Sequence, residues 1–445
     1  MTPHYDVIIV GGRPAGSTLA ARLGAQGLRV LLLERAAFPS LPAASSPIIY
    51  SPTLQLLDEI GADEAAYARG TPRIRRVIGA GVGFSAALRL PAAHGRDYAY
   101  AIDRARFDAA LWDNALRFPT VTGRQQFGVT DLLWDGGRVV GVKGRPLPLT
   151  AFASPLHGEG AQNHVEEESF TADVVVGADG RYSLVARKVD AKVYDEHTAH
   201  PTSLYYAYWR GVKPYDEDGA TAVAYEGRPG YGFLVMDSAD GRTLIGMEGR
   251  ADLLNPPPKG VEAFYLDIVR GNRAIATRIA EAERATDVHG IRRIGNLYRQ
   301  PGGVGWALTG DAYHQHDPLD GQGIYNAVFT AKALAWAIRY WKVGDKSWAG
   351  ALEWYDETAR AKTYGRYKAA LLSVQQSIYN PQLPGWALGG LRWVMEDPAM
   401  HDLFGKLLTR QLPPEVITAL TAPTLVGAMV RGPLRDLRKR LAEYL

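Results

Sequence analysis

The order of apolar and polar stretches at the start of the chain predicts two buried strands joined by a helix. An apolar, β-branched run at Val7–Val10 ends in a glycine-rich turn, and a second apolar run follows at Val30–Leu33. Between the runs, Leu19, Leu23 and Leu28 fall in a stretch with helical spacing. Short apolar runs of this kind are typical of strands buried on both faces of a parallel sheet. The pattern therefore predicts a strand–turn–helix–strand unit of about the length of one βαβ motif.

The rest of the chain divides into stretches with strand or helix periodicity. A helix is clearly indicated at 104–117, where Asp103 is placed to cap the first turn. Between residues 200 and 250, aromatic-rich alternating stretches separated by Gly and Asp turns predict an antiparallel sheet in a separate domain. The other predicted elements are helices at 52–61, 261–284, 322–341 and in much of 346–445, and strands at 73–101, 124–144, 172–176 and 305–308.

Composition limits the size and the chemistry of the protein. With 445 residues and 47% hydrophobic content, the chain can bury a large core and form two or more domains. Its net charge of +3 is too balanced to indicate nucleic acid or an anionic membrane as a partner. The absence of cysteine excludes disulfides and thiolate metal sites. Because neither a signal peptide nor a membrane span is indicated, we expect a soluble, cytoplasmic protein.

The glycine-rich turn after the first strand is the first candidate for a chemical role. Its sequence, Gly11-Gly12-Arg13-Pro14-Ala15-Gly16, leaves backbone N–H groups and a helix N-terminus where a pyrophosphate can lie. Glu34 ends the second strand, where a carboxylate can accept both hydroxyls of an adenosine ribose. Arg13 stands where G-x-G-x-x-G has its second glycine, so it must swing aside or add its charge to the phosphates. A strand pair with a tight turn and no ligand is the alternative interpretation.

Two further motifs follow, each at the end of a predicted strand. The strand at 172–176 leads into Gly177-Ala178-Asp179-Gly180, and the strand at 305–308 leads into TGDAYHQHDPLDGQGIYNA at 309–327. Together with the N-terminal unit, these motifs resemble the FAD-dependent oxidoreductases of the para-hydroxybenzoate hydroxylase fold over about residues 5–345. That family holds group A flavoprotein monooxygenases, geranylgeranyl-reductase-like enzymes and flavin-dependent halogenases.

The resemblance implies an α/β fold with a Rossmann-like FAD-binding domain, an antiparallel β-sheet substrate domain and a helical C-terminal segment. We expect a discontinuous FAD-binding domain formed by residues 1–45, 95–195 and 286–345. Residues 46–94 and 196–285 would then form the substrate-binding domain. The remaining residues, 346–445, would form the helical C-terminal segment.

The resemblance also implies which residues hold FAD. Asp311 would bind a ribityl hydroxyl, Asp179 and Gly180 would lie near the flavin, and Arg104 would face a phosphate or the ribityl chain. The backbone around Val129 would flank the adenine. A second helix N-terminus, after the P-x-x-G-x-G pattern, would stabilise negative charge on the reduced flavin ring. The expected cofactor-binding residues are Gly11, Gly12, Arg13, Pro14, Ala15, Gly16, Glu34, Arg35, Arg104, Val129, Asp179, Gly180, Gly310, Asp311, Pro318, Gly321, Gln322 and Gly323.

Catalytic and substrate-binding residues are marked less clearly. His314 and His316 follow the Gly-Asp motif, where either could relay a proton beside the flavin or be a hydrogen-bonded structural histidine. The pattern H-x-H-D is too little for a metal site, so no metal is expected. Tyr206, Tyr208 and Phe233 are the candidate substrate contacts, although on an alternating strand half of the side chains must point elsewhere.

The presence of a single dinucleotide-binding motif limits the range of possible flavin reactions. Group A monooxygenases have this arrangement, in which NAD(P)H binds transiently, reduces FAD and leaves. The resemblance then implies a flavin C4a-hydroperoxide that hydroxylates an aromatic or other hydrophobic small molecule with O₂. The alternative is an FAD-dependent reductase of C=C bonds or another FAD oxidoreductase. Tyr231-Gly232-Phe233 followed by Gly241 is similar to the aromatic motif of the geranylgeranyl-reductase-like sub-group.

Two other functions agree less well with the residues. A halogenase of this fold is expected to carry W-x-W-x-I-P, which the corresponding stretch at 230–241 lacks. A non-catalytic binding protein on the same fold, such as a Rab GDP-dissociation inhibitor, would have no need to retain Gly11, Gly16, Glu34 and Asp311.

The last predicted helix, at 434–445, has an amphipathic pattern. The leucines Leu434, Leu437, Leu441 and Leu445 follow helical spacing against the basic residues Arg435, Arg438, Lys439 and Arg440. A membrane-surface helix has this pattern, but four leucines also fill an ordinary core stripe. We expect them to pack on the protein's own core.

Overall fold

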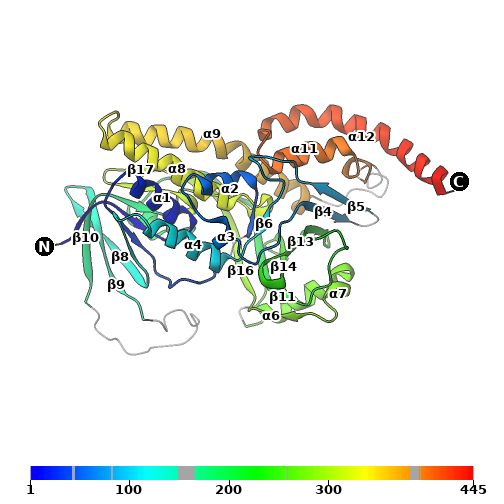
Figure 1. The fold of residues 1–445 in the computed structure, drawn as a ribbon, viewed down its shortest axis with the longest axis horizontal. Helices are drawn as coiled ribbons and strands as arrows, with labels where there is room; N and C mark the ends of the chain where they lie inside the picture. Colours follow the sequence, from blue (N-terminus) through cyan, green and yellow to red (C-terminus); the bar gives the residue numbers. More distant parts are fainter. Residues whose placement is uncertain are drawn as a thin grey trace.

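The fold consists of two large sheets with helices packed around them (Figure 1). The computed structural model describes residues 2–42, 46–81, 84–148, 166–257, 259–380, 390 and 392–443. The two ends of the chain lie at opposite ends of the view in Figure 1. The α/β class predicted from the sequence is confirmed.

The first sheet has parallel strands at its centre, as the N-terminal pattern predicts. β1 pairs in parallel with β2 on one side and with β10 on the other, so that Val7 is opposite both Val30 and Val174. The strands, in the order β17-β18-β10-β1-β2-β7 with the hairpin β8–β9 attached to β10, are β17 (Gly302–Gly303), β18 (Trp306–Leu308), β10 (Glu168–Gly177), β1 (His4–Val10), β2 (Val30–Leu33), β7 (Val121–Arg124), β8 (Phe127–Asp135) and β9 (Arg138–Pro146). All of β2 is buried, which explains its unbroken apolar run.

Helices pack around the first sheet into one hydrophobic core. Helix α1 contacts both α4 and α8. The helices of this core are α1 (Pro14–Ala25), α4 (Arg104–Leu116), α5 (Leu184–Lys188), α8 (Gly323–Lys342), α9 (Trp348–Val374), α2 (Ser51–Asp58) and α3 (Glu64–Tyr67). Leu54, Leu57 and Tyr67 lie in this core, so residues 51–67 pack with the first sheet. This differs from the expected boundary, which assigned residues 46–94 to the other domain.

The second sheet is mostly antiparallel, as the alternation between residues 200 and 250 predicts. Its strands, in the order β19-β16-β11-β14-β13-β12-β4-β5, are β19 (His314–Gln315), β16 (His289–Arg299), β11 (Val193–Arg210), β14 (Arg242–Arg250), β13 (Tyr231–Asp237), β12 (Thr221–Glu226), β4 (Arg76–Gly81) and β5 (Phe84–Arg89). β16 pairs with β11 along most of its length. Residues 289–299 therefore belong to this sheet and not, as expected, to the domain of the first sheet.

The two faces of β11 pack into different cores. Tyr205 and Trp209 pack in a core with α6 (Val261–Gly271) and α7 (Arg273–Arg278). We call the side of β11 that meets these helices the outer face. Tyr206 and Tyr208 join a separate core on the inner face. The remaining short elements are β3 (Ile48–Ile49), β6 (Tyr100–Ala101), η2 (Ala239–Gly241), β15 (Glu283–Arg284), η3 (Gly310–Ala312), η4 (Pro318–Asp320) and η5 (Gln375–Tyr379).

The C-terminal segment adds α11 (Pro398–Leu408) and α12 (Pro414–Glu443). In Figure 1, α12 runs past the body of the molecule and carries the C-terminus away from both sheets. Leu434, Leu437 and Leu441 are 54%, 55% and 55% exposed, so the expectation that they pack on the protein's core is wrong. The fourth leucine, Leu445, lies outside the described residues. No helix in the described ranges is both long enough and apolar enough to cross a membrane.

Candidate functional site

The three sequence motifs meet at one edge of the first sheet. β1, β10 and β18 run in parallel side by side, so their carboxyl ends share that edge. A Cβ atom built on Gly11 would lie 2.4 Å from the carbonyl oxygen of Ala178, and one built on Gly310 would lie 2.8 Å from Cβ of Ala15. Both later motifs therefore touch the N-terminal turn. Ligands of open α/β sheets bind at this edge.

The N-terminal turn leaves backbone N–H groups free at the start of α1. Arg13 precedes the helix and makes no side-chain cap bond, whereas Asp103 caps α4 through two N–H groups. The first N–H groups of a helix have no acceptor within the helix, and the helix dipole is positive there. A Cβ on Gly16 would lie 1.7 Å from the carbonyl oxygen of Gly11, so only glycine permits this close turn. The turn is therefore built as an anion site.

Glu34 is fixed beside this turn at the end of β2. Its side chain is buried, Oε2 accepts the N–H of Gly12 at 2.8 Å, and Oε1 accepts the N–H of Ala36 at 2.9 Å. Each oxygen keeps a further lone pair for another donor. Two hydroxyls of a ribose are donors of that kind. Arg35, the next residue, is exposed.

Arg13 turns aside from the turn and pairs with a buried carboxylate. Its Nη1 lies 2.6 Å from Oδ2 of Asp108, and Arg104 donates to the same carboxylate at 3.0 and 2.9 Å. Asp108 is fully buried and Arg104 is 7% exposed. This explains how the chain accommodates an arginine where the motif has a glycine. Because two guanidinium groups share one carboxylate, the cluster keeps a net positive charge beside the anion site.

The aspartates of the two later motifs have different surroundings. Asp311 is partly exposed, and its Oδ2 lies 3.3 Å from Nε of Arg181. Asp179 accepts bonds from Ser183 Oγ at 2.5 Å and from the N–H of Leu184 at 2.7 Å. Burial raises the pKa of Asp179. The side chain of Asp179 therefore caps α5, while that of Asp311 is open to a ligand.

A second helix N-terminus lies at the start of α8. Gly321 has a φ of 66°, and a Cβ there would lie 2.5 Å from Cγ2 of Ile48; a Cβ on Gly323 would meet nothing within 4 Å. Gln322 does not cap the helix, because its Oε1 accepts a bond from Nε of Arg410 at 2.8 Å. Burial lowers the pKa of Arg410 to about 9. The sequence gives no sign of this contact, which joins residues 88 positions apart.

His314 and His316 lie in a buried stack with Tyr298. The rings of His314 and Tyr298 are 4.0 Å apart, and the two histidine rings are 5.3 Å apart. His316 has Asp320 at 3.0 Å and Asn326 at 3.2 Å as hydrogen-bond partners. Burial holds the pKa of His314 well below its usual value. His316 thus has the partners of a structural histidine, and His314 is uncharged at neutral pH.

A buried pair of carboxyl groups joins the second sheet to the same loop. Burial and the neighbouring Asp317 raise the pKa of Glu248, on β14, well above its usual value. Asp317 also accepts a bond from Thr202 at 2.5 Å. A neighbouring carboxylate disfavours a second negative charge, so the raised pKa favours the protonated form of Glu248. The sequence does not single out Glu248, because a single glutamate in an alternating strand is typical of a solvent-facing position.

Tyr206 and Tyr208 form an aromatic wall on the inner face of β11. Both lie in one core with Tyr50 and Ile48, the residue that abuts Gly321 at the start of α8. The ring of Tyr206 also stacks on His289 at 5.5 Å. Burial raises the pKa of Tyr206 to about 12. We call Tyr50, Tyr206, Tyr208 and His289 the aromatic wall.

The other two predicted contact residues lie elsewhere. Phe233 packs with Met247 in the core of the outer face, so it does not line the aromatic wall. Val129 lies on β8, opposite Gly144. The same strand begins at Phe127, whose N–H donates to the carbonyl of Glu34 at 3.0 Å. The expectation that the Val129 backbone flanks an adenine stays a prediction.

A comparison with protein families identifies the cofactor of the protein. The model of the FAD binding domain family matches residues 4–363, a range that contains all three motifs. The chain belongs to this family. FAD is therefore the cofactor, and the protein is an FAD-dependent enzyme.

Curated relatives of this FAD enzyme catalyse three different reactions. A digeranylgeranylglycerophospholipid reductase of Methanosphaerula palustris is 26% identical over 85% of this chain and 88% of its own. The flavin-dependent halogenase otaD of Aspergillus niger is 24% identical over 95% of this chain and 85% of its own. The 6-methylpretetramide 4-monooxygenase of Streptomyces rimosus is 29% identical over 74% of each chain.

Solved structures agree on the fold. The flavin-dependent brominase Bmp2 superposes with a TM-score of 0.71 at 21% identity, covering 91% of this chain and 93% of its own. A geranylgeranyl bacteriochlorophyll reductase-like protein of Thermoplasma acidophilum has a TM-score of 0.66 at 17% identity and covers both chains completely, at 100% each. At these sequence identities, the similarity shows a shared fold and nothing more.

The residues of the site fit FAD. Besides Gly11 and Gly16, Gly12 is also closely approached, since a Cβ there would lie 2.5 Å from the ring of Trp112. The bare turn, the free start of α1 and the fixed Glu34 carboxylate together match an adenosine diphosphate group. Within the described part of the chain, no group of three or more His, Asp or Glu side chains could hold a metal ion.

Replacing Glu34 or Asp311 with alanine is expected to weaken FAD retention. Each substitution removes charged acceptors for ligand hydroxyls, worth about 1.5–3 kcal/mol per bond, so Kd should rise about tenfold to hundredfold. Flavin absorbance per protein after purification, followed by titration of the apoprotein, measures the change. Glu281, which lies on the surface with a side chain 78% exposed, provides the control Glu281→Ala. Full flavin content in both site variants would contradict the placement.

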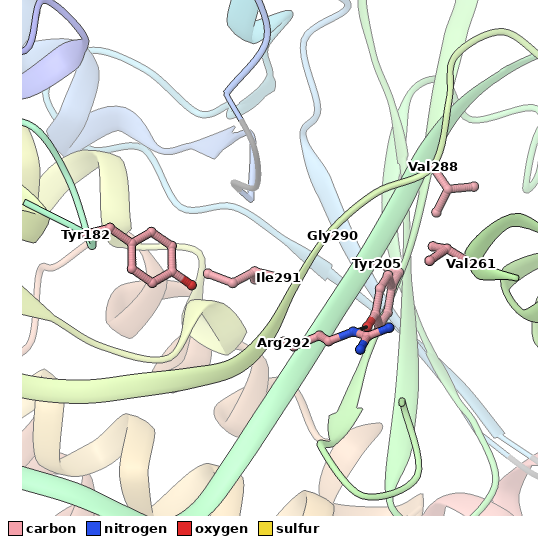
Figure 2. A pocket seen from close by; sticks show the side chains of 7 residues that line it. All are labelled: Tyr182, Tyr205, Val261, Val288, Gly290, Ile291 and Arg292. Atoms are coloured by element: carbon pink, nitrogen blue, oxygen red, sulfur yellow. Dashed lines mark hydrogen bonds between the residues drawn. The ribbon is translucent and has the colours of Figure 1, made fainter. Parts of the chain in front are cut away.

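A cavity of about 450 Å³ lies on the outer face, away from the aromatic wall. It is lined by Tyr182, Tyr205, Val261, Val288, Gly290, Ile291 and Arg292. Figure 2 shows Tyr182 and Ile291 extending toward one another, with Arg292 beside Tyr205. Nε of Arg292 donates to the Tyr205 hydroxyl at 3.3 Å. Because Tyr205 and Tyr206 point to opposite faces of β11, the cavity and the aromatic wall are separate features.

Proposed function

We propose that this protein is a monooxygenase that uses NAD(P)H and O₂ to hydroxylate an aromatic or other hydrophobic small molecule. Bound FAD would carry two electrons from NAD(P)H to O₂; one oxygen atom enters the substrate and the other leaves as water. The observation that carries the proposal is the aromatic wall beside the start of α8. The monooxygenase of Streptomyces rimosus, 29% identical, supports it.

The residues at the edge of the first sheet would hold the cofactor. Glu34 would accept the ribose hydroxyls, and the N–H groups at the start of α1 would bind the pyrophosphate. The net positive charge of Arg13 and Arg104 around Asp108 would offset the charge of the phosphates. Asp311 would accept a ribityl hydroxyl, the role for which its partial exposure leaves it open.

The start of α8 would stabilise negative charge on the reduced ring. Its dipole is positive at this end, and no side chain caps it. Arg410 adds a guanidinium group, which donates to Gln322 at 2.8 Å and to Asn326 at 3.0 Å. A positive site that exists before the ring is reduced needs no rearrangement at that moment.

The aromatic wall would position the substrate and exclude water. Tyr206 and Tyr208 are 3% and 2% exposed, so water is almost completely excluded from their rings. Flat aromatic molecules pack well against such rings in offset or edge-to-face geometry. Excluding water protects reactive oxygen chemistry from side reactions. The aromatic wall would therefore favour a hydrophobic substrate. By excluding water, it would also couple the consumption of NAD(P)H to the formation of product.

Reduction of a C=C bond is the second candidate function. The reductase of Methanosphaerula palustris covers more of both chains than the monooxygenase does, 85% and 88% against 74%. The dry aromatic wall suits an isoprenoid chain as well as a ring. In this case NAD(P)H would supply a hydride through FAD, and the solvent a proton, without use of O₂.

Product mass distinguishes the reactions. The holoenzyme is given NAD(P)H, a panel of phenolic, polycyclic aromatic and prenylated compounds, and bromide-containing buffer, with and without O₂. We expect a product heavier by one oxygen atom, formed only with O₂ and labelled by heavy-isotope oxygen gas. A product heavier by two hydrogens formed without O₂ would instead establish the reductase, and bromine in place of hydrogen a halogenase.

Neighbouring tyrosines on β11 provide a matched pair of variants. Tyr206→Leu alters the aromatic wall, whereas Tyr205→Leu makes the same change on the outer face. We expect Tyr206→Leu to raise KM at least about tenfold and to waste NAD(P)H without product, since one buried aromatic contact is worth about 1.5 kcal/mol or more. Equal effects of the two substitutions on KM would contradict the assignment of the wall to the substrate.

A further inference from the structure

Helix α12 carries an exposed apolar stripe along its length. The side chains that form it share one side of the helix and are about half exposed or more: Val426 64%, Met429 45%, Val430 62%, Leu434 54%, Leu437 55% and Leu441 55%. Water-exposed apolar side chains are normal when scattered singly, but six on one helix face form a contiguous surface. We call these six residues the α12 stripe.

The opposite side of α12 is the side that packs on the protein. Ala428 is completely buried, and a Cβ on Gly432 would lie 2.1 Å from Cγ of Trp393. Arg435 is held by Asp397 at 2.7 Å on this side. With about 3.6 residues per turn, these positions lie across the helix axis from Leu434 and its neighbours. The body of the protein therefore holds the helix so that the stripe points outward, although Met429 at its margin also approaches Gly390.

Basic side chains border the stripe. Arg438 and Arg440 are exposed, and their spacing places them on opposite sides of Leu437. A nearby acid, Asp436, is engaged on the protein side by Arg392 and Trp393. The outer half of the helix end thus combines an apolar centre with positive margins.

These positive margins disfavour a second copy of the chain as the covering partner. In a two-helix pairing along Leu434, Leu437 and Leu441, the residues flanking the seam are Arg438 and Arg440. Parallel and antiparallel pairing would both bring arginine against arginine. Flanking positions of stable coiled coils carry complementary charges. An anionic lipid surface can contact both parts of this face, because its acyl chains take up the apolar α12 stripe and its phosphates pair with the arginines at the margins.

We propose that α12 lies flat on an anionic phospholipid surface. The α12 stripe enters the boundary between headgroups and acyl chains, while Arg438 and Arg440 reach the lipid phosphates. The helix projects past the body of the molecule, so the surface can reach it without obstruction from either sheet (Figure 1). This is attachment in the plane of a membrane, and it is independent of the reaction that the flavin site catalyses.

Vesicle flotation of the FAD-loaded protein tests the proposal. Vesicles of phosphatidylcholine alone are compared with equal parts of phosphatidylcholine and phosphatidylglycerol. We expect binding to the mixed vesicles that exceeds binding to the neutral ones at least about tenfold and weakens as salt is added. The triple variant Leu434→Gln, Leu437→Gln, Leu441→Gln should lose at least about tenfold in binding. Arg438→Gln with Arg440→Gln should remove the preference for anionic lipid.

The control variant changes exposed apolar residues elsewhere. Val304, Val343 and Leu372 are 60%, 61% and 51% exposed and lie outside α12, so their replacement with glutamine should leave binding unchanged. Flavin absorbance checks that each variant is folded. Absence of binding to anionic vesicles at low salt would overturn the proposal. So would a dimer in light scattering that the leucine variant converts to monomer without any vesicle binding, since a second copy would then cover the stripe.

Discussion

Gly16→Ala is expected to abolish FAD binding and to unfold much of the first sheet. The new Cβ would lie 1.7 Å from the carbonyl oxygen of Gly11 and 3.3 Å from Ile9. The first neighbour is backbone at the end of the central strand β1, so it cannot rotate away as a side chain would. We expect a loss of more than about 4 kcal/mol in the free energy of unfolding, which places it among the largest single-substitution effects. Flavin absorbance and denaturant unfolding measure the two consequences.

Gly271→Ala is the matched control for this substitution. Gly271 ends α6, and a Cβ there would meet nothing within 4 Å. Its replacement should leave flavin content unchanged and alter stability by less than about 1 kcal/mol. If Gly16→Ala retained flavin at the level of this control, the close contact between turn and helix would not exist in solution.

Asp108→Ala is expected to destabilise the protein by about 3–5 kcal/mol. The substitution leaves two guanidinium groups, of Arg13 and Arg104, without the carboxylate that they share. Breaking a buried ion pair by removing one partner leaves an uncompensated charge, and the cost is of this size. The free energy of unfolding from urea titration is the measurement.

Arg13→Leu is the comparison for the buried cluster. It removes one of the two cations, while Asp108 keeps its two bonds to Arg104 at 3.0 and 2.9 Å. We expect less than half the loss of stability caused by Asp108→Ala. FAD should be retained but bound less tightly, because one positive charge near its phosphates is removed. A loss below about 1 kcal/mol for Asp108→Ala would mean that water replaces the carboxylate and that the cluster is not buried.

Local patterns predicted the parts of the fold that depend on neighbouring residues. The runs at Val7–Val10 and Val30–Leu33 became the central parallel strands, because a strand covered on both faces needs apolar side chains at every position. The convergence of three motifs also followed, since the ends of parallel strands share one edge of a sheet. Asp103 was identified as a cap from its place before a helical stretch, and it caps α4.

Features that depend on distant contacts could not be predicted in this way. Alternation on a strand divides side chains between two faces but does not say which face meets a given helix, so Phe233 was grouped with Tyr206 although they lie in different cores. Arg410 could not be found, because its partner Gln322 is far away in sequence. In sequence, the leucines of α12 match a stripe that packs on a core and a stripe that is exposed equally well. Only the packing of Ala428 and Gly432 on the protein shows that the leucines are on the exposed side.

The strand order of the first sheet has a consequence for synthesis on the ribosome. The parallel neighbours of β1 are β2, at residues 30–33, and β10, at 168–177, whereas β18 and the start of α8 follow only after residue 305. The nascent chain must therefore keep its N-terminal turn open until the whole second sheet has emerged. Chains with such long-range pairings fold slowly and expose apolar surface meanwhile. A shortened chain that ends before α8 cannot complete the cofactor site, and slower translation or chaperone supply should raise the yield of flavin-loaded protein.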